Sequence, residues 1–205
     1  VPVEPEVIKR IERIVPTLHA QGSWLLGAAL GALLLFYVTL RFVHAQRSKL
    51  LFRETSVITA SCYKGKAKTD GRRMAFRFRI PLCPSMELLW TLWNTMSRKT
   101  RKAQTYLIFD HTTSLPFNLS TFTDALRVVC RLAHAVTNVE VVTSYSFRRA
   151  CQRGGFDNED VAPTSHINLY VGDYVVTTNR ANRGDFPVAF KAGTNTVTHF
   201  REHSS

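Results

Sequence analysis

The sequence predicts an α/β or α+β protein in which one N-terminal transmembrane helix precedes a single small mixed-sheet domain with helices packed on it. Two observations carry this prediction. Residues 23–40 form a run of eighteen residues without a charge, and the segments after residue 47 alternate between strand-like and helix-like patterns. We therefore expect an amphipathic segment over residues 1–20, the membrane helix over 21–46, a basic domain over 47–190 and a polar tail over 191–205.

The N-terminal segment is predicted to be a short amphipathic helix. Val7, Ile8 and Ile11 recur at helical spacing, with charged residues on the opposite side. Pro16 is expected to break or kink this helix, so that it ends near Ile14. Such a segment suits a membrane surface or a contact with a partner subunit, and a solvated lead-in to the span is an equal alternative.

The run over 23–40 has the length of a membrane helix. At about 1.5 Å of rise per residue it covers about 27 Å, close to the hydrocarbon thickness of a bilayer. A helix buried in a protein core is the alternative, because eighteen residues lie at the lower limit for a span. Small residues four apart allow close helix approach, which predicts packing against a second membrane helix through Gly27, Ala28, Gly31 and Ala32.

The flank after this run predicts an orientation. Basic residues follow it, among them Arg41, Arg47 and Lys49, and no acidic residue occurs before Glu54. Flanks of this kind stay in the compartment that retains basic loops, which for a mitochondrial inner membrane is the matrix. A cleaved presequence followed by a single stop-transfer helix would instead leave the domain in the intermembrane space.

The domain is predicted to alternate strands and helices, which favours a parallel or mixed sheet covered by helices. Strands are expected over 56–62 and 73–80, joined by a turn at Asp70 and Gly71, and a helix capped by Ser85 follows them. The remaining predicted elements are a strand over 106–109, a helix after Ser120, a strand over 138–143, a helix over 144–153, a hairpin over 166–178 and a strand near 195–200.

Residues 73–156 resemble STAS-like domains in the order of their segments. The likeness lies in the strand YLIFDHTTSLPF, a helix after Asn118-Leu119-Ser120, the strand NVEVVTS and the helix SFRRACQRGGF. The resemblance implies an α/β fold and, in that family, an Asp-Ser-Ser-Gly type turn whose serine can be phosphorylated. Here Asn118, Leu119, Ser120 and Thr121 stand in that place, so the acidic residue and the glycine are missing and the phosphorylation switch does not carry over.

Few residues point to catalysis, a metal or a cofactor. Asp110 and His111 follow a predicted strand, where α/β proteins often place reactive groups, and Cys151 or Ser120 could act as their nucleophile. No third motif supports such a triad, and turn or capping roles are the alternative. The cysteines lack metal-ligand spacing, and phosphate-binding or dinucleotide-binding glycine motifs are missing. We expect a protein that is not an enzyme and has no cofactor or metal.

Basic residues provide the strongest chemical signal. The net charge is +12, and eleven basic residues but only two acidic ones lie between Lys64 and Lys102. We expect contacts with anionic phospholipids such as cardiolipin or with acidic partner subunits, through Arg41, Arg47, Lys49, Lys64, Lys66, Lys68, Arg72 and Arg73. Nucleic acid is the less favoured partner, with Tyr63, Phe76 and Phe78 as stacking surfaces, and a merely solvated basic face is a further alternative.

These expectations combine into a functional hypothesis. The layout resembles single-span accessory subunits of mitochondrial respiratory-chain complexes or ATP synthase, which implies a non-catalytic assembly subunit of an inner-membrane complex, bound to its other subunits. The alternative is a membrane-tethered binding or regulatory domain of a STAS-like, import-machinery or RNA- and ribosome-anchoring kind.

Overall fold

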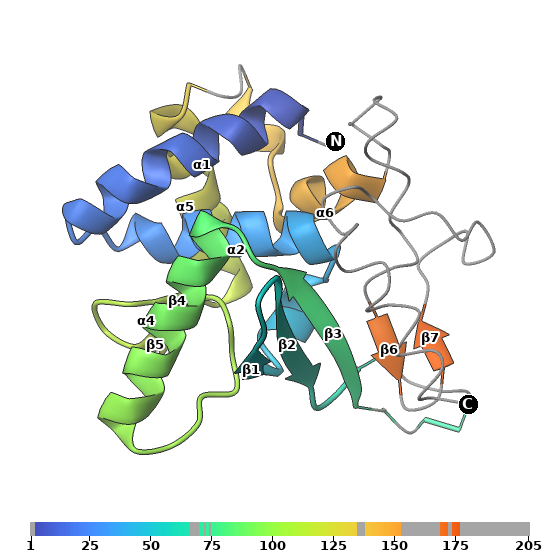
Figure 1. Ribbon diagram of the computed structural model, residues 1–205. Coiled ribbons are helices and arrows are strands. Elements are labelled where there is room, and N and C mark those ends of the chain that lie inside the picture. The colour runs from blue at the N-terminus through green and yellow to red at the C-terminus, as the bar shows by residue number, and fades with distance from the viewer. Residues whose placement is uncertain are drawn as a thin grey trace.

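A computed structural model describes residues 3–65, 70–71, 73, 75–134, 138–152, 169–171 and 174–176. These residues form an α+β structure in which helices surround a central helix and a three-stranded antiparallel sheet packs beside it (Figure 1). The predicted strand near 195–200 and the polar tail lie outside the described residues. In chain order the elements are α1 Pro5–Ala20, α2 Leu25–Val38, α3 Phe42–Ala45, β1 Ser48–Arg53, β2 Val57–Cys62, β3 Phe76–Pro81, α4 Pro84–Thr100, β4 Phe109–Asp110, β5 Leu115–Pro116, α5 Leu119–Leu132, the 3-10 helix η1 Val139–Val141, α6 Ser144–Gln152, β6 Leu169–Val171 and β7 Tyr174–Val176.

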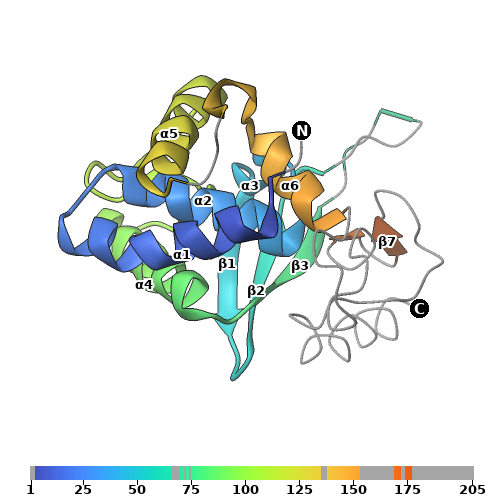
Figure 2. The ribbon, with the colours of Figure 1, turned by 90° about the horizontal axis from the view of Figure 1, so that it is seen from above.

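Helix α2 is the centre of the core. Every one of its residues is buried except Tyr37, which is half-buried. It contacts α1, α4, α5, α6, β3 and β4, so that apolar side chains meet it on all sides (Figures 1 and 2). A helix that is apolar all round needs apolar surroundings on every face, and here the rest of the chain provides them.

The predicted transmembrane helix is therefore wrong. Within the described part of the chain, no helix combines the length and the apolar character needed to cross a membrane. The uncharged run yields only the fourteen residues of α2, or about 21 Å of helix, because Thr39 adopts the left-handed conformation (φ 49°) and ends it. The alternative of a helix buried in a protein core describes α2 correctly.

The small residues of α2 make their close contacts within the same chain. A Cβ on Gly27 would overlap the carbonyl oxygen of Phe109 and lie 2.9 Å from Cε2 of Phe117. A Cβ on Gly31 would lie 2.8 Å from Cγ2 of Ile108 and 2.9 Å from Cε2 of Phe122. The face that was expected to meet another membrane helix thus carries the segment around β4 and the start of α5, while Ala28 and Ala32 are fully buried in the core.

Helix α1 continues through Pro16, where a break was predicted. Proline removes one backbone hydrogen bond from a helix interior. The buried side chains of Val15 and Leu18 lie on either side of it, and their packing in the core holds the helix together to Ala20. The predicted break was therefore wrong, because tertiary packing outweighs the lost hydrogen bond.

The sheet has the order β1-β2-β3 and is antiparallel throughout, so a parallel or mixed sheet was a wrong prediction for the described residues. Strand β1 lies in the basic flank after the uncharged run and was not predicted, whereas β2 and β3 were. The register aligns Ser48, Cys62 and Phe76 in one row at the end of the sheet nearest α3. Phe78 and Ile80 follow Phe76 at alternate positions of β3, on the face of the sheet that packs against the core, and both are fully buried.

The later segments depart further from the sequence prediction. The predicted strand over 138–143 is wrong, because its centre forms η1, and the strand over 106–109 is reduced to the two residues of β4. Helix α5 begins at Leu119, two residues before the predicted start, because the side chain of Asn118 caps it by accepting a hydrogen bond from the backbone N–H of Thr121 (2.8 Å). The C-terminal hairpin is confirmed by the antiparallel pairing of β6 with β7.

The contact at Gly27 makes a testable prediction. Gly27→Ala should lower the free energy of unfolding by about 3 kcal/mol, because its methyl group meets a backbone carbonyl that cannot rotate away. Gly31→Ala is the matched control and should cost less, about 1 kcal/mol, since it meets the ends of two side chains. Urea denaturation measures both, and a Gly27→Ala protein as stable as the wild type would contradict this packing.

Candidate functional site

The turn after α2 brings two distant arginines together. Thr39, at the end of α2, is fully buried and has a positive φ, a conformation that costs a non-glycine residue free energy and tends to occur at functional sites. Its carbonyl oxygen accepts a hydrogen bond from Nε of Arg148 in α6 (2.7 Å). The same turn places Arg41 at the start of α3, close enough to Arg148 to lower its pKa.

Arg148 is a buried cation. Its side chain lies in the core between α6 and α2, and only 2% of the residue is exposed. Burial first, and then the charge of Arg41, lower the pKa of Arg148 to about 10, so that it stays protonated at neutral pH. Tyr145 packs its ring 5.6 Å from the guanidinium carbon of Arg148 and opposes this shift through a hydrogen bond. The protein therefore keeps a positive charge where charges are costly.

His44 in α3 lies among four arginines. Burial lowers its pKa to about 4, and the charges of Arg41, Arg148, Arg47 and Arg73 act in the same direction, in that order. Its ring stands edge-on to Phe76, with centroids 5.5 Å apart, and its Nδ1 atom is buried without a hydrogen-bond partner. His44 is therefore a neutral, unsatisfied polar group at neutral pH.

The end of the sheet supplies the other two arginines. Arg47 immediately precedes β1, and its carbonyl oxygen accepts a hydrogen bond from the N–H of Tyr63 (2.9 Å), just beyond β2. Its guanidinium donates to the carbonyl oxygen of Lys64 (3.4 Å), which fixes it against the chain that leaves β2. Arg73 is exposed on the approach to β3. The antiparallel register thus gathers these residues beside α3.

We call Arg41, Arg47, Arg73 and Arg148, grouped around His44, the arginine cluster. None of the four forms an ion pair with a carboxylate among the described residues. Elsewhere the chain pairs its arginines: Arg53 with Glu87 (2.7 Å) and Arg131 with Glu140 (2.8 Å). Four cations of which one is buried, without carboxylate partners, form a site suited to an anionic ligand.

The structure distributes the predicted basic residues differently. Arg41, Arg47 and Arg73 belong to the arginine cluster, and Lys64 adjoins it. Lys49 is exposed on β1 and lies in a register row with Ser61 and Arg77, on the sheet face away from the core. Lys66, Lys68 and Arg72 lie outside the described residues. Of the expected stacking residues, Tyr63 is exposed, whereas Phe76 and Phe78 are core.

Sequence reasoning missed Arg148, His44 and Tyr145. One signal was available for Arg148, because it lies between Phe147 and Ala150 on the face of α6 that is buried. A charge on the apolar face of an amphipathic helix is rarely neutral for folding and commonly marks a paired or functional group. No signal in the sequence alone joins this residue to Arg41.

Asp110 has a structural explanation, whereas the Nδ1 atom of His111 is buried without a hydrogen-bond partner. The Asp110 carboxylate accepts hydrogen bonds from the backbone N–H (2.9 Å) and hydroxyl (2.6 Å) of Thr112, which stabilise the turn between β4 and β5. No described hydrogen bond links either residue to Ser120, which is exposed on α5. Among the described residues, no group of three histidine, cysteine or acidic side chains could hold a metal ion.

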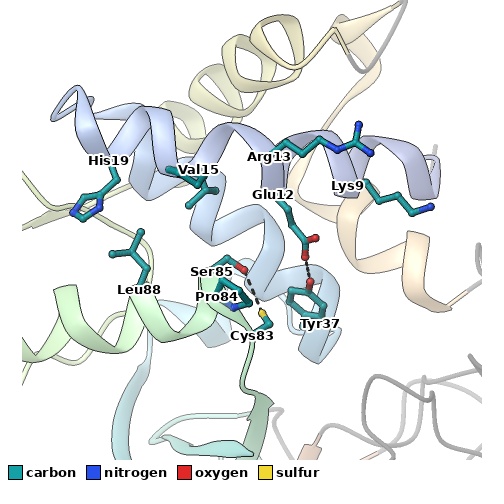
Figure 3. A pocket seen from close by; sticks show the side chains of 11 residues that line it. Lys9, Glu12, Arg13, Val15, His19, Tyr37, Cys83, Pro84, Ser85 and Leu88 are labelled. Carbon is teal, nitrogen blue, oxygen red and sulfur yellow. Dashed lines mark hydrogen bonds between the residues drawn. The ribbon is translucent and has the colours of Figure 1, made fainter.

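A separate pocket of about 590 Å³ lies between α1, the last turn of α2 and the start of α4 (Figure 3). The Glu12 carboxylate accepts a hydrogen bond from the Tyr37 hydroxyl, and burial raises the pKa of Glu12. Cys83 Sγ and Ser85 Oγ, which also line the pocket, lie 3.3 Å apart. Because its wall carries charges of both signs beside apolar groups, the pocket defines a ligand less sharply than the arginine cluster does. The other lining residues are Lys9, Arg13, Val15, Pro16, His19, Pro84 and Leu88.

Comparison with protein-family models, with curated proteins and with solved structures finds no significant match to the chain.

The burial of His44 makes a prediction about acid stability. Its pKa is about 4 in the folded protein and near the ordinary 6.5 when unfolded, so the unfolded chain binds more protons between these values. Stability from this residue is therefore complete above about pH 6.5 and lost as the pH falls towards 4, by up to about 3 kcal/mol.

Urea denaturation between pH 4.5 and 7.5 measures this loss. His44→Gln, which cannot titrate, should show a shallower decline than the wild type. His19→Gln, a change at an exposed residue of α1, is the control and should follow the wild type. Parallel curves for all three proteins would show that His44 does not titrate on unfolding.

Proposed function

We propose that this protein binds nucleic acid and that the arginine cluster holds a phosphate group of the backbone. The observation that carries the proposal is the convergence of Arg41 and buried Arg148 on the His44 side of the α2 turn, without a described carboxylate partner. A guanidinium presents a planar fork of N–H donors that matches two oxygens of a phosphate. A bound phosphate would offset the charge that the cluster concentrates.

The surroundings of the cluster favour a ligand with many phosphates. Lys64 adjoins it, and Lys49 and Arg77 add two exposed cations on the outer face of the sheet, two strands apart and so about 10 Å from each other. A nucleic acid carries a continuous series of charged phosphates, so cations this far apart can contact different phosphates of one backbone. Exposed Tyr63, beside Lys64, adds an aromatic surface of the kind on which unpaired bases stack.

Lipid and protein partners explain the cluster less well. Binding to an anionic bilayer depends on exposed, mobile cations, each worth about 1 kcal/mol, and needs no buried arginine held in a fixed orientation. An acidic protein could pair with arginines as carboxylates do, but would not call for the outer row of cations on the sheet. Both partners are distinguishable outcomes of the binding experiment.

The accessory-subunit role in a mitochondrial inner-membrane complex rested on the uncharged run as a membrane helix. Since α2 is buried in the core, that role and that location lose the observation from which they were inferred. The accessory-subunit role, the mitochondrial location and the STAS-like resemblance stay predictions. The alternative of a membrane-tethered binding domain loses its tether in the same way. Its RNA-binding part was inferred from the basic residues and does not depend on a membrane helix.

Binding can be tested by fluorescence anisotropy with a labelled 20-base-pair DNA duplex and with single-stranded RNA of equal length, between 50 and 200 mM salt. The Kd should rise steeply with salt for at least one of them, because counterions are released when phosphates are neutralised. Arg41→Gln should weaken binding and reduce the slope of log Kd against log salt by about 1. Arg53→Gln, which removes the same charge at the far end of β1, is the matched control and should keep the slope.

Two outcomes would overturn the proposal. One is tight binding to vesicles containing anionic lipid, or to an acidic peptide, with no measurable binding to either nucleic acid. The other is nucleic-acid binding whose salt slope is equal in the wild type and in Arg41→Gln.

Phosphoryl transfer on the bound strand is a second candidate function, favoured specifically by Arg148. An arginine that is buried and held by the Thr39 carbonyl is also preorganised to stabilise charge that develops on a phosphate during a reaction. In such a reaction one P–O bond forms as another breaks, and the arginines offset the added charge on the non-bridging oxygens. This candidate departs from the non-catalytic role expected from the sequence.

Denaturing gels of end-labelled duplexes test this candidate. The wild type should convert the substrate to a shorter strand, if water attacks, or to a protein-linked strand, if a side chain does. Arg148→Lys keeps the positive charge but loses the planar pair of guanidinium N–H donors. Turnover should therefore fall at least about 100-fold, while the Kd changes less than about tenfold. Arg149→Lys is the neighbouring control. Absence of both products with the wild type would exclude this candidate and leave binding standing.

A further inference from the structure

We infer that the arginine cluster takes up its phosphate ligand together with a proton, and that His44 is the residue that accepts this proton. The inference rests on the proposed function and adds to it a chemical coupling between ligand and pH. It depends on three features of the arginine cluster: the position of His44, its missing hydrogen bond and the sign of the charges around it.

The position is fixed by backbone structure. His44 lies in α3, between Arg41 at the start of that helix and Arg47 before β1, and only 7% of the residue is exposed. The Ser48 hydroxyl donates a hydrogen bond to the His44 carbonyl oxygen (2.6 Å), which ties α3 to β1. The backbone of His44 is therefore held at this junction, and its buried imidazole lies within the electrostatic influence of the four arginines.

The missing hydrogen bond points to a second state of the ring. A buried polar atom without a partner carries a free-energy cost that a structure rarely retains without a reason. The Nδ1 atom of His44 is such an atom. In the protonated imidazolium both ring nitrogens are donors, and an anion nearby stabilises that form. A phosphate bound among the arginines would therefore favour the protonated ring.

The charges around His44 set the direction of the coupling. Arg41 and Arg47 face it from α3 and its C-terminal flank, Arg73 from the approach to β3 and Arg148 from α6, and all of them disfavour its protonation. Cys62 in β2, near Arg47 and Ser48, has a pKa raised by burial and stays neutral. Among the described residues, no carboxylate shifts the pKa of His44, so a phosphate bound in the cluster would act against the charges of the four arginines.

Reciprocity then fixes the pH dependence. If the ligand raises the proton affinity of His44, a proton must raise the affinity for the ligand by the same factor. Because the pKa is higher in the complex than in the free protein, protons are taken up on binding. Affinity should increase as the pH falls through the pKa of the complex, by up to tenfold per pH unit, until the pKa of the free protein is reached.

Isothermal titration calorimetry of the full chain with a 20-base-pair DNA duplex tests the coupling. Titrations at pH 6 in two buffers of different ionisation enthalpy give the number of protons taken up. The wild type and the His19→Gln control should take up a measurable fraction of a proton, up to one per site, and His44→Gln close to none. NMR titration of the His44 ring in the wild type, free and bound, gives the same pKa difference without relying on a variant that folds.

The outcomes separate the inference from the proposed function. Duplex binding without proton uptake, or with equal uptake in His44→Gln, overturns the inference and leaves the proposed function in place. If no nucleic acid binds, the proposed function fails, and sulfate serves as the probe because it does not titrate in this range. A sulfate-induced rise in the pKa of His44 would then support the coupling at an anion site, and an unchanged pKa would reject it.

Discussion

Burial of α2 on every side is the constraint on which the rest of this structure depends. An uncharged helix of fourteen residues has no polar face to turn towards water, so each neighbouring element must present an apolar face to it. Helix α1 does so with Ile11, Val15 and Leu18, and α5 with Phe122 and Leu126. The two glycines of α2 allow the β4 segment to approach within backbone contact. The other helices and the sheet thus share one hydrophobic core, with α2 at its centre.

The candidate site follows from how this helix ends. The left-handed conformation of Thr39 turns the chain towards the sheet, and the buried carbonyl oxygen of Thr39 accepts a hydrogen bond from Nε of Arg148. The buried cation, the neutral histidine and the end of the sheet then meet in one place. A site built on a helix terminus and a sheet edge is rigid, and rigidity is what charge stabilisation requires, since the dipoles and charges are already oriented when a ligand arrives.

Local patterns predicted many elements, and long-range packing decided what they do. Strands β2 and β3, helix α5 and the β6-β7 hairpin were readable from alternation, helical spacing and turn residues. The role of α2 was not, because eighteen uncharged residues look alike in lipid and in a protein core until their neighbours are known. The density of basic residues in the sequence marked Arg41, Arg47 and Arg73 as candidate contact residues, and the structure places all three around His44. That density could not foretell Arg148, whose place depends on a bond across 109 residues of chain.

That bond has a consequence for when the arginine cluster forms. It joins Thr39 to Arg148, and the segment between them contains the β1-β2-β3 sheet, α4 and α5. During synthesis α2 and the sheet emerge before α6, so Arg41, Arg47 and Arg73 are made before Arg148. The four arginines therefore come together only when α6 packs on α2, and a chain that ends before α6 carries three of them.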